Sequence, residues 1–162
     1  PDGSLEEFIP IWQRLVADVP LTWLPRTQPI TRWLAEPGRR LRTADVLALH
    51  RRLAQRLLRH FEDADVWVTP TVAVPPPRVG SFAGRPPAEA FADAAKLGMF
   101  TAAFNLTGQP AASVPLGLTS EGLPMAVQIA GPPFGDDVVL ALSRQLEEAL
   151  PWRSRRAPMA SD

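Results

Sequence analysis

Serine is a residue type in this chain that could act as a catalytic nucleophile, and Ser113 has the most suggestive setting, NLTGQPAASVPLG at 105–117. A serine nucleophile needs a base within hydrogen-bond reach and donors that stabilise the oxyanion. Ser113 lacks the Gly-x-Ser-x-Gly turn that lifts a hydroxyl clear of a strand, and Val114 and Pro115 follow it instead of a helix. We interpret Ser113 as a packed strand residue, with a nucleophile as the alternative. Ser81, in VGSFAG, is predicted to be a turn residue.

Histidine, cysteine and lysine offer little further chemistry. The two histidines, His50 and His60, are ten residues apart on one expected helix, about 15 Å at the rise of an α-helix. That spacing does not make a two-histidine metal site, and the absence of cysteine excludes thiolate sites. The single lysine, Lys96, stands near Asp93 and is predicted to be a surface residue. From these residue types alone, the sequence predicts neither a metal site nor a complete catalytic set.

Composition narrows the class of partner. The chain has 17 basic and 17 acidic residues among 162, which argues against a nucleic-acid binder that needs a basic surplus. No apolar run approaches the roughly 18 residues of a membrane span, and no signal peptide is visible. We therefore expect a cytoplasmic protein without a membrane partner. Because the sequence begins with proline, we expect it to be a piece of something longer.

Hydrophobic periodicity predicts the elements that must position any site. Apolar residues recur at helical spacing in four segments and form short apolar runs in three others. The helices are expected at 4–19, 43–64, 88–106 and 136–150, and the strands at 66–69, 111–115 and 124–131. A short helix is also expected around TRWLAE, and the third long helix should be either interrupted or closely packed at Gly98. In the last strand, Met125, Val127 and Ile129 should share one face, opposite Ala126 and Gln128.

Capping residues mark the expected helix starts. Ser4 and Glu7 form a capping box pattern, and Thr43 and Asp136 are predicted N-caps. Pro10 should kink the first helix or delay its start, and Phe8, Trp12, Leu15, Val16 and Val19 should form its apolar stripe.

The order of elements predicts an α/β fold with a sheet covered by helices. We expect residues 1–162 to form a single unit. Within it, 1–42 should be peripheral helices and loops, 43–150 a helix-strand-helix-strand-strand-helix series, and 151–162 a tail.

Several motifs in a fixed order resemble the C-terminal part of amidase signature family enzymes. They comprise an Asn-x-x-Gly-x-Pro-Ala segment, Ser-Val-Pro-x-Gly, Gly-Leu-Pro-x-x-x-Gln and a helix with Leu-Glu. The matching residues are Asn105, Gly108, Pro110, Ala111, Ser113, Val114, Pro115, Gly117, Gly122, Leu123, Pro124, Gln128, Leu146 and Glu147. The segment from Phe61 to Pro77 also looks like the family's helix, strand and Pro-Thr exit. The resemblance covers about two thirds of the chain, and its relatives include broad-specificity amidases similar to 6-aminohexanoate-cyclic-dimer hydrolases.

The resemblance implies a fold and a mechanism. The fold would be the C-terminal portion of the amidase signature fold, a mixed sheet covered by helices. The reaction would be amide hydrolysis through a Ser–cis-Ser–Lys triad without metal or cofactor. The family's lysine and Gly/Ser-rich signature precede everything matched here, so the catalytic residues would lie outside this chain. We therefore expect the chain alone to be inactive.

The resemblance also suggests substrate-binding residues. We expect Phe100, Thr101, Phe104 and Asn105 to lie in or beside the pocket. The alternatives are core packing of Phe100 and Phe104 at i, i+4 and a helix C-cap role for Asn105. The family's glutamine-using subunits carry an acidic residue where this chain has Gly98, which cannot hold an amino group by a charge-assisted bond. This favours an apolar or aryl amide substrate.

Two other functions stay open at this point. The chain could be a non-catalytic scaffold or interaction domain with half an amidase fold, or part of a glutamyl-tRNA amidotransferase A-type subunit. The partner expected for the hydrolase is a small-molecule amide, which the chain would bind together with the missing N-terminal part. A homodimer is the expected assembly if the protein forms an oligomer.

Overall fold

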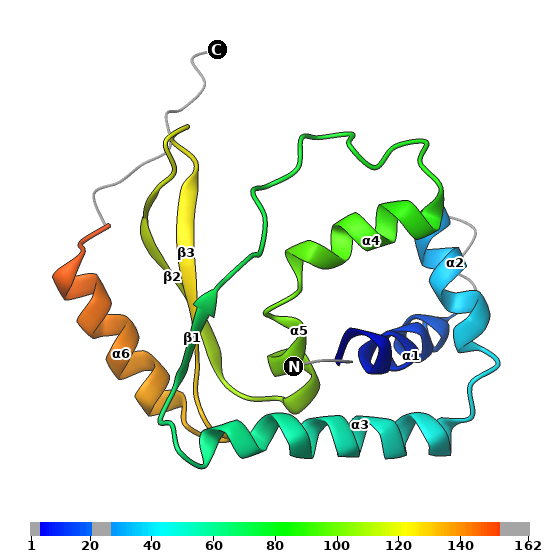
Figure 1. Cartoon of the computed structure of the whole chain (residues 1–162), viewed down its shortest axis with the longest axis horizontal. Coiled ribbons are helices and arrows are strands. Elements are labelled where there is room, and N and C mark those ends of the chain that lie inside the picture. Colours follow the sequence, from blue (N-terminus) through cyan, green and yellow to red (C-terminus); the bar gives the residue numbers. More distant parts are fainter. Residues whose placement is uncertain (1–3, 21–26, 153–162) are drawn as a thin grey trace. The chain divides into compact units, whose positions relative to one another are not determined.

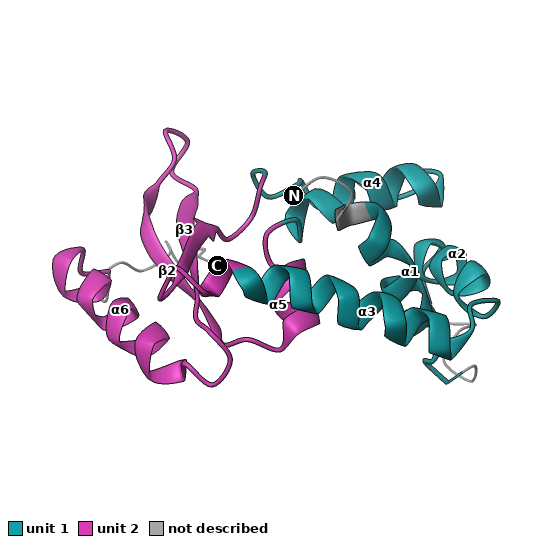
Figure 2. Cartoon of the chain, turned by 60° about the horizontal axis from the view of Figure 1, so that its bottom comes forward, with its two compact units in different colours: residues 1–59, 74–99 teal, residues 60–73, 100–162 magenta. Residues whose placement is uncertain are grey.

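The computed structural model describes residues 4–20 and 27–152, which divide between two compact units. The first unit comprises residues 1–59 and 74–99, and the second comprises residues 60–73 and 100–162 (Figure 2). We expected residues 1–162 to form a single folding unit. The division into two compact units does not test whether they fold together, so this expectation stays a prediction.

The first unit is helical. Its helices are α1 (Ser4–Ala17), α2 (Pro29–Gly38), α3 (Thr43–Leu58) and α4 (Pro87–Leu97). Helix α1 packs against α2 and α3, and α2 packs against α4. Leu34 and Leu53 are among its buried residues. The short helix expected around TRWLAE is confirmed as α2, whereas the helix expected over 43–64 ends at Leu58, followed by a 3-10 turn at Arg59–Phe61.

The buried side of α1 differs from the expected stripe. Ile11 is buried, whereas Trp12 and Leu15 are exposed. Helix α1 contacts two neighbouring helices, and those contacts select a face next to the one that periodicity alone indicated. Pro10 lies inside α1, which begins at Ser4, so it does not delay the start of the helix.

The predicted N-caps are shifted by one residue. Arg42 is the N-cap of α3 and Gly135 that of α6, so Thr43 and Asp136 are instead the first helical residues. Neither cap makes a side-chain hydrogen bond. Acidic residues in both first turns favour the positive end of the helix dipole instead. The capping box at Ser4 lies outside the described side chains.

The second unit is a small sheet with helices. It contains β1 (Trp67–Pro70), α5 (Ala102–Thr107), β2 (Ala111–Leu118), β3 (Pro124–Ala130) and α6 (Asp136–Ala149). The strand order is β1-β3-β2, and both pairings are antiparallel (Figure 1). The expected α/β arrangement is confirmed. The interruption expected at Gly98 is also confirmed, because α4 ends there and α5 begins a few residues later.

One face of this sheet packs on α6. Val114 and Ile129 are buried with Val139 of the helix, and Val127 packs against them. The predicted alternation in β3 is therefore confirmed at Val127 and Ile129, although Met125 is exposed beyond an irregularity in the register between Pro115 and Gly117. The opposite face carries Ser113 and Gln128, which are directly paired.

Within residues 4–20 and 27–152, the structure contains no helix with the length and apolar character needed to cross a membrane.

Candidate functional site

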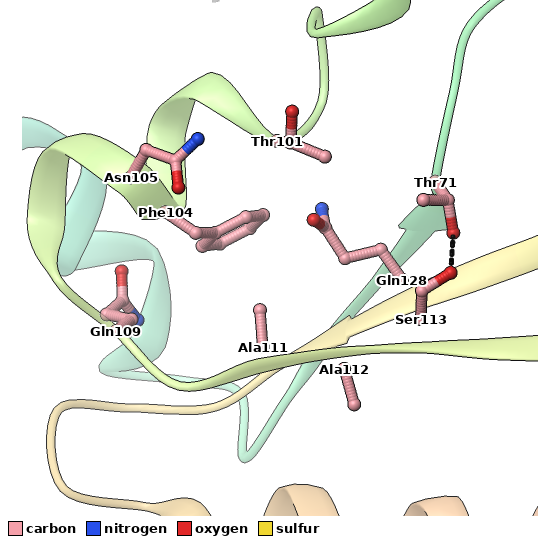
Figure 3. Close-up of a pocket in the computed structure, with 9 residues that line it drawn as sticks. All are labelled: Thr71, Thr101, Phe104, Asn105, Gln109, Ala111, Ala112, Ser113 and Gln128. Carbon is pink, nitrogen blue, oxygen red and sulfur yellow. Dashed lines mark hydrogen bonds between the residues drawn. The ribbon is translucent and has the colours of Figure 1, made fainter.

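A cavity of about 330 Å³ lies within the second unit (Figure 3). Its walls come from the end of β1, from α5 and the turn after it, and from β2 and β3. The lining residues are Thr71, Thr101, Phe104, Asn105, Gln109, Ala111, Ala112, Ser113 and Gln128. None of these side chains is ionisable, and six of them carry a neutral hydrogen-bonding group. This volume lies at the lower end of the range for small-molecule sites.

The turn after α5 is shaped by a glycine and locked by a glutamine. Gly108 ends α5 in the left-handed conformation, with φ of 70°, which glycine adopts without strain. Buried Gln109 then donates from Nε2 to the Gly131 carbonyl at 2.6 Å, and Thr107 Oγ1 donates to its Oε1 at 2.8 Å. These bonds hold the start of β2 against the end of β3, and so fix one wall of the cavity.

Gln128 ties the start of α5 to the sheet. Its side chain is only 5% exposed, and its Nε2 donates to Thr69 Oγ1 at 3.2 Å and to the Phe100 carbonyl at 3.3 Å. Thr69 is its direct partner in the β1–β3 register. The peptide just before Thr101 is therefore anchored to the central strand, which positions the α5 residues that face the cavity.

Ser113 lies on β2, as predicted, but its side chain is exposed at the cavity instead of packed. The prediction of close packing is wrong because this face of the sheet carries the cavity, while α6 covers the other face. Ser113 Oγ lies 2.8 Å from Thr71 Oγ1. A threonine hydroxyl is not a base that could accept the serine proton, so this contact does not activate a nucleophile.

Three of the four predicted binding residues line the cavity: Thr101, Phe104 and Asn105. Phe100 is half-buried and contributes its carbonyl to Gln128, but its side chain is not part of the lining. Whether any of the four contacts a substrate stays a prediction.

The structure also tests the alternative roles of these residues, which were core packing for Phe100 and Phe104 and a helix C-cap for Asn105. Asn105 lies inside α5, and the C-cap is Gly108, so the C-cap role for Asn105 is wrong. Phe104 is buried and its ring meets the Trp67 ring edge-on at 6.1 Å, which is core packing. Phe100 precedes α5, so it does not pair with Phe104 along one helix.

Gln128, Gln109 and Thr71 were missed as site residues. One signal could have found the first of them. Gln128 is the one polar residue of β3 and lies on the side opposite Val127 and Ile129, a position that faces either solvent or a site. For Gln109 the sequence holds no comparable signal, because its partner Gly131 is distant in the chain.

The other candidate groups have structural partners. Lys96 Nζ bonds Asp93 Oδ1 at 2.7 Å on the surface, as predicted, and Arg85 bonds Asp93 Oδ2 at 2.8 Å. The hydrogen bond from Lys96, followed by that from Arg85, lowers the pKa of Asp93 below its ordinary value. The His60 ring packs against Trp67 at 4.8 Å. In the described ranges, no cluster of three or more histidine or acidic side chains could hold a metal ion.

Known proteins that are similar to this chain in sequence include amidases and other amide hydrolases. The profile of the Amidase family matches residues 26–140. The "Putative amidase AmiB2" of Mycobacterium tuberculosis is 40% identical over 116 residues, which cover 72% of this chain and 24% of that protein. The 6-aminohexanoate-cyclic-dimer hydrolase of Paenarthrobacter ureafaciens is 49% identical over 57 residues, covering 35% of this chain and 12% of that one.

A solved structure of 6-aminohexanoate cyclic dimer hydrolase superposes with a TM-score of 0.73 at 27% identity. The superposition covers 83% of this chain and 30% of the hydrolase. The chain thus spans about a quarter of the length of the M. tuberculosis relative.

Proposed function

Because this chain belongs to the amidase signature family, we propose that it is the C-terminal part of an amide-bond hydrolase and forms one wall of its substrate pocket. The observation that carries the proposal is the cavity in the second unit, which lies among the motifs typical of the family. Its lining includes Thr101, Phe104 and Asn105, the residues for which the family resemblance implies a place near the substrate.

The proposed reaction uses a Ser–cis-Ser–Lys triad in the portion of the protein that precedes this chain. The serine attacks the amide carbonyl, and the lysine and the bridging serine relay the proton to the leaving amine. Backbone amides hold the oxyanion. The role of this chain is to bind and orient the substrate, which raises the effective concentration of the carbonyl at the nucleophile. Ser113 takes no part in bond making.

We propose an apolar or aryl amide as the substrate. The described lining offers neutral hydrogen-bonding groups and the Phe104 ring, without a side-chain charge that would pair with a charged substrate. Gly98, the C-cap of α4, has no side chain with which to hold an amino group. Both features favour a hydrolase of neutral amides over a subunit that binds glutamine.

The test is hydrolysis of an aryl amide such as 4-nitroacetanilide, followed by release of 4-nitroaniline. The 162-residue chain alone should show no turnover, while the same chain within its whole protein should be active. Turnover by the chain alone that Ser113→Ala abolishes would overturn the proposal. A whole protein that binds the amide without hydrolysing it would support the non-catalytic alternative.

A further inference from the structure

The orientation of the Gln128 amide can be assigned from its partners. The Phe100 carbonyl can only accept a hydrogen bond, so the atom that faces it at 3.3 Å must be the donor Nε2. The same Nε2 faces Thr69 Oγ1 at 3.2 Å. Both hydrogens of the amide nitrogen are therefore used within the protein, and the polar atom that remains is the acceptor Oε1.

This acceptor belongs to a rigid side chain at the cavity. Gln128 is 5% exposed and sits on β3, which has a hydrogen-bonded neighbour on each side. Its side chain points into the space between Thr101 and the Thr71–Ser113 pair (Figure 3). With its nitrogen held by two elements, the amide cannot rotate to present a donor without losing both bonds. The oxygen is a preorganised acceptor.

The other polar groups of the lining are less selective. Thr71 and Ser113 share a hydrogen bond, and a hydroxyl can either donate or accept by rotating. Gln109 is committed to Gly131 and Thr107. The Asn105 side chain is exposed on α5. Gln109 uses both ends of its amide in these bonds, whereas the two bonds of Gln128 use only its nitrogen and fix the direction of its oxygen.

We propose that Gln128 Oε1 accepts a hydrogen bond from the N–H of the bound amide, and that it thereby distinguishes an amide from an ester of the same shape. The inference rests on the proposed function, because it assumes that the cavity takes the amide. An ester places an oxygen without hydrogen at this position. The Gln128 oxygen, shielded from water by the bound ligand, is then left opposite another acceptor, and the discrimination comes from that unpaired group.

The test compares two probes that differ at one position, N-methylbenzamide and methyl benzoate. Each is titrated into the whole protein, ¹⁵N-labelled at glutamine, and the backbone and side-chain amide resonances are followed before turnover. N-methylbenzamide should bind about tenfold more tightly than the ester, on the scale of one buried hydrogen bond. It should also shift the resonances of the Gln128 side-chain NH₂, because polarisation of the carbonyl changes the whole amide group.

The Gln128→Met variant should bind both probes with equal affinity. Gln145→Met is the matched control, since Gln145 is exposed on α6, and it should retain the tenfold preference. If Gln128→Met does not fold, the two probes on the unaltered chain still decide the matter.

The outcomes separate this inference from the proposed function. Equal affinity of both probes, with shifts at the cavity, would overturn the role of Gln128 and leave the cavity as an amide site. No shift at the cavity with either probe would overturn both the role of Gln128 and the assignment of the cavity. Hydrolysis by the whole protein is measured independently of both.

Discussion

The hydroxyls of Thr71 and Ser113 lie 2.8 Å apart and join the two outer sides of the sheet across its central strand. Ser113 is paired with β3 on one side. Thr71 follows β1 on the other side, where its backbone N–H donates to the Ala126 carbonyl of β3 at 3.3 Å. The hydrogen bond therefore spans β3 and closes the sheet at the rim of the cavity.

Removing either hydroxyl should destabilise the chain modestly. Ser113→Ala and Thr71→Val should each lower the free energy of unfolding by about 0.5–1 kcal/mol, because both groups lie at an exposed position where water can replace the lost partner. The double variant should cost little more than one single variant, since both changes remove the same bond. Urea unfolding followed by tryptophan fluorescence measures each term. Ser113→Ala combined with Ser81→Ala should be additive, and additivity in the Thr71 pair would contradict a shared bond.

Gln109→Met should lower the free energy of unfolding by more than Ser113→Ala or Thr71→Val does. The change keeps the volume of the side chain but leaves the Gly131 carbonyl without the donor that now bonds it at 2.6 Å in a buried position. An unsatisfied buried group costs about 1–3 kcal/mol. The same urea experiment gives the value, with Gln145→Met, an exposed site on α6, as the control. Equal stability of the two variants would show that the Gln109 bond contributes nothing.

Gly38→Ala should be strongly destabilising. A methyl group at Gly38 would lie 2.1 Å from the Gln13 carbonyl oxygen, so α1 and α2 would have to separate. Forcing such a shift costs about 1–3 kcal/mol or more. Gly117→Ala is the matched control, because a Cβ there meets nothing within 4 Å. Thermal unfolding of both variants tests the close contact, and a Gly38→Ala chain as stable as the control would disprove it.

Acid should weaken the first unit through Glu7. The hydrogen bond from Arg56 lowers the pKa of Glu7 below its ordinary value against the opposing effect of burial, with a further bond from Arg52 at 3.2 Å. Because the folded pKa is depressed, this contribution to stability is complete above the unfolded pKa. It is lost as the pH falls through the folded value. The urea concentration at the midpoint of unfolding should therefore stay constant from pH 7 downward and decrease once the pH is below about 4.5.

Glu7→Gln should remove part of this acid dependence, because the neutral amide does not titrate. Glu6→Gln changes a neighbouring exposed carboxyl on the same helix and serves as the control. Identical pH profiles for Glu7→Gln and the unaltered chain would argue against the pairing with Arg56.

Sequence patterns predicted the elements better than they predicted the contacts between elements. The helix at α3, the break at Gly98 and the alternation of Val127 and Ile129 depend on local spacing and on the flexibility of glycine, which the sequence records directly. The buried side of α1 was predicted wrongly because two neighbouring helices decide it.

The site was predicted only where its residues are close together in the chain. Three of the proposed binding residues follow one another closely in the chain, so a single motif suggested all of them. The anchoring bond from Gln128 to the Phe100 carbonyl joins residues far apart in sequence, and no spacing rule connects them. The exposure of Ser113 depends on which face of the sheet α6 covers, and periodicity does not indicate that choice.

The strand order β1-β3-β2 has a consequence for how the sheet assembles. Among the described strands, β1 pairs only with β3, and Thr69 meets Gln128 across an intervening chain that contains α4, α5 and β2. Contacts of such long sequence separation close late and slow folding. During synthesis, the β1 segment cannot pair with β3 until the chain has been extended as far as Ala130.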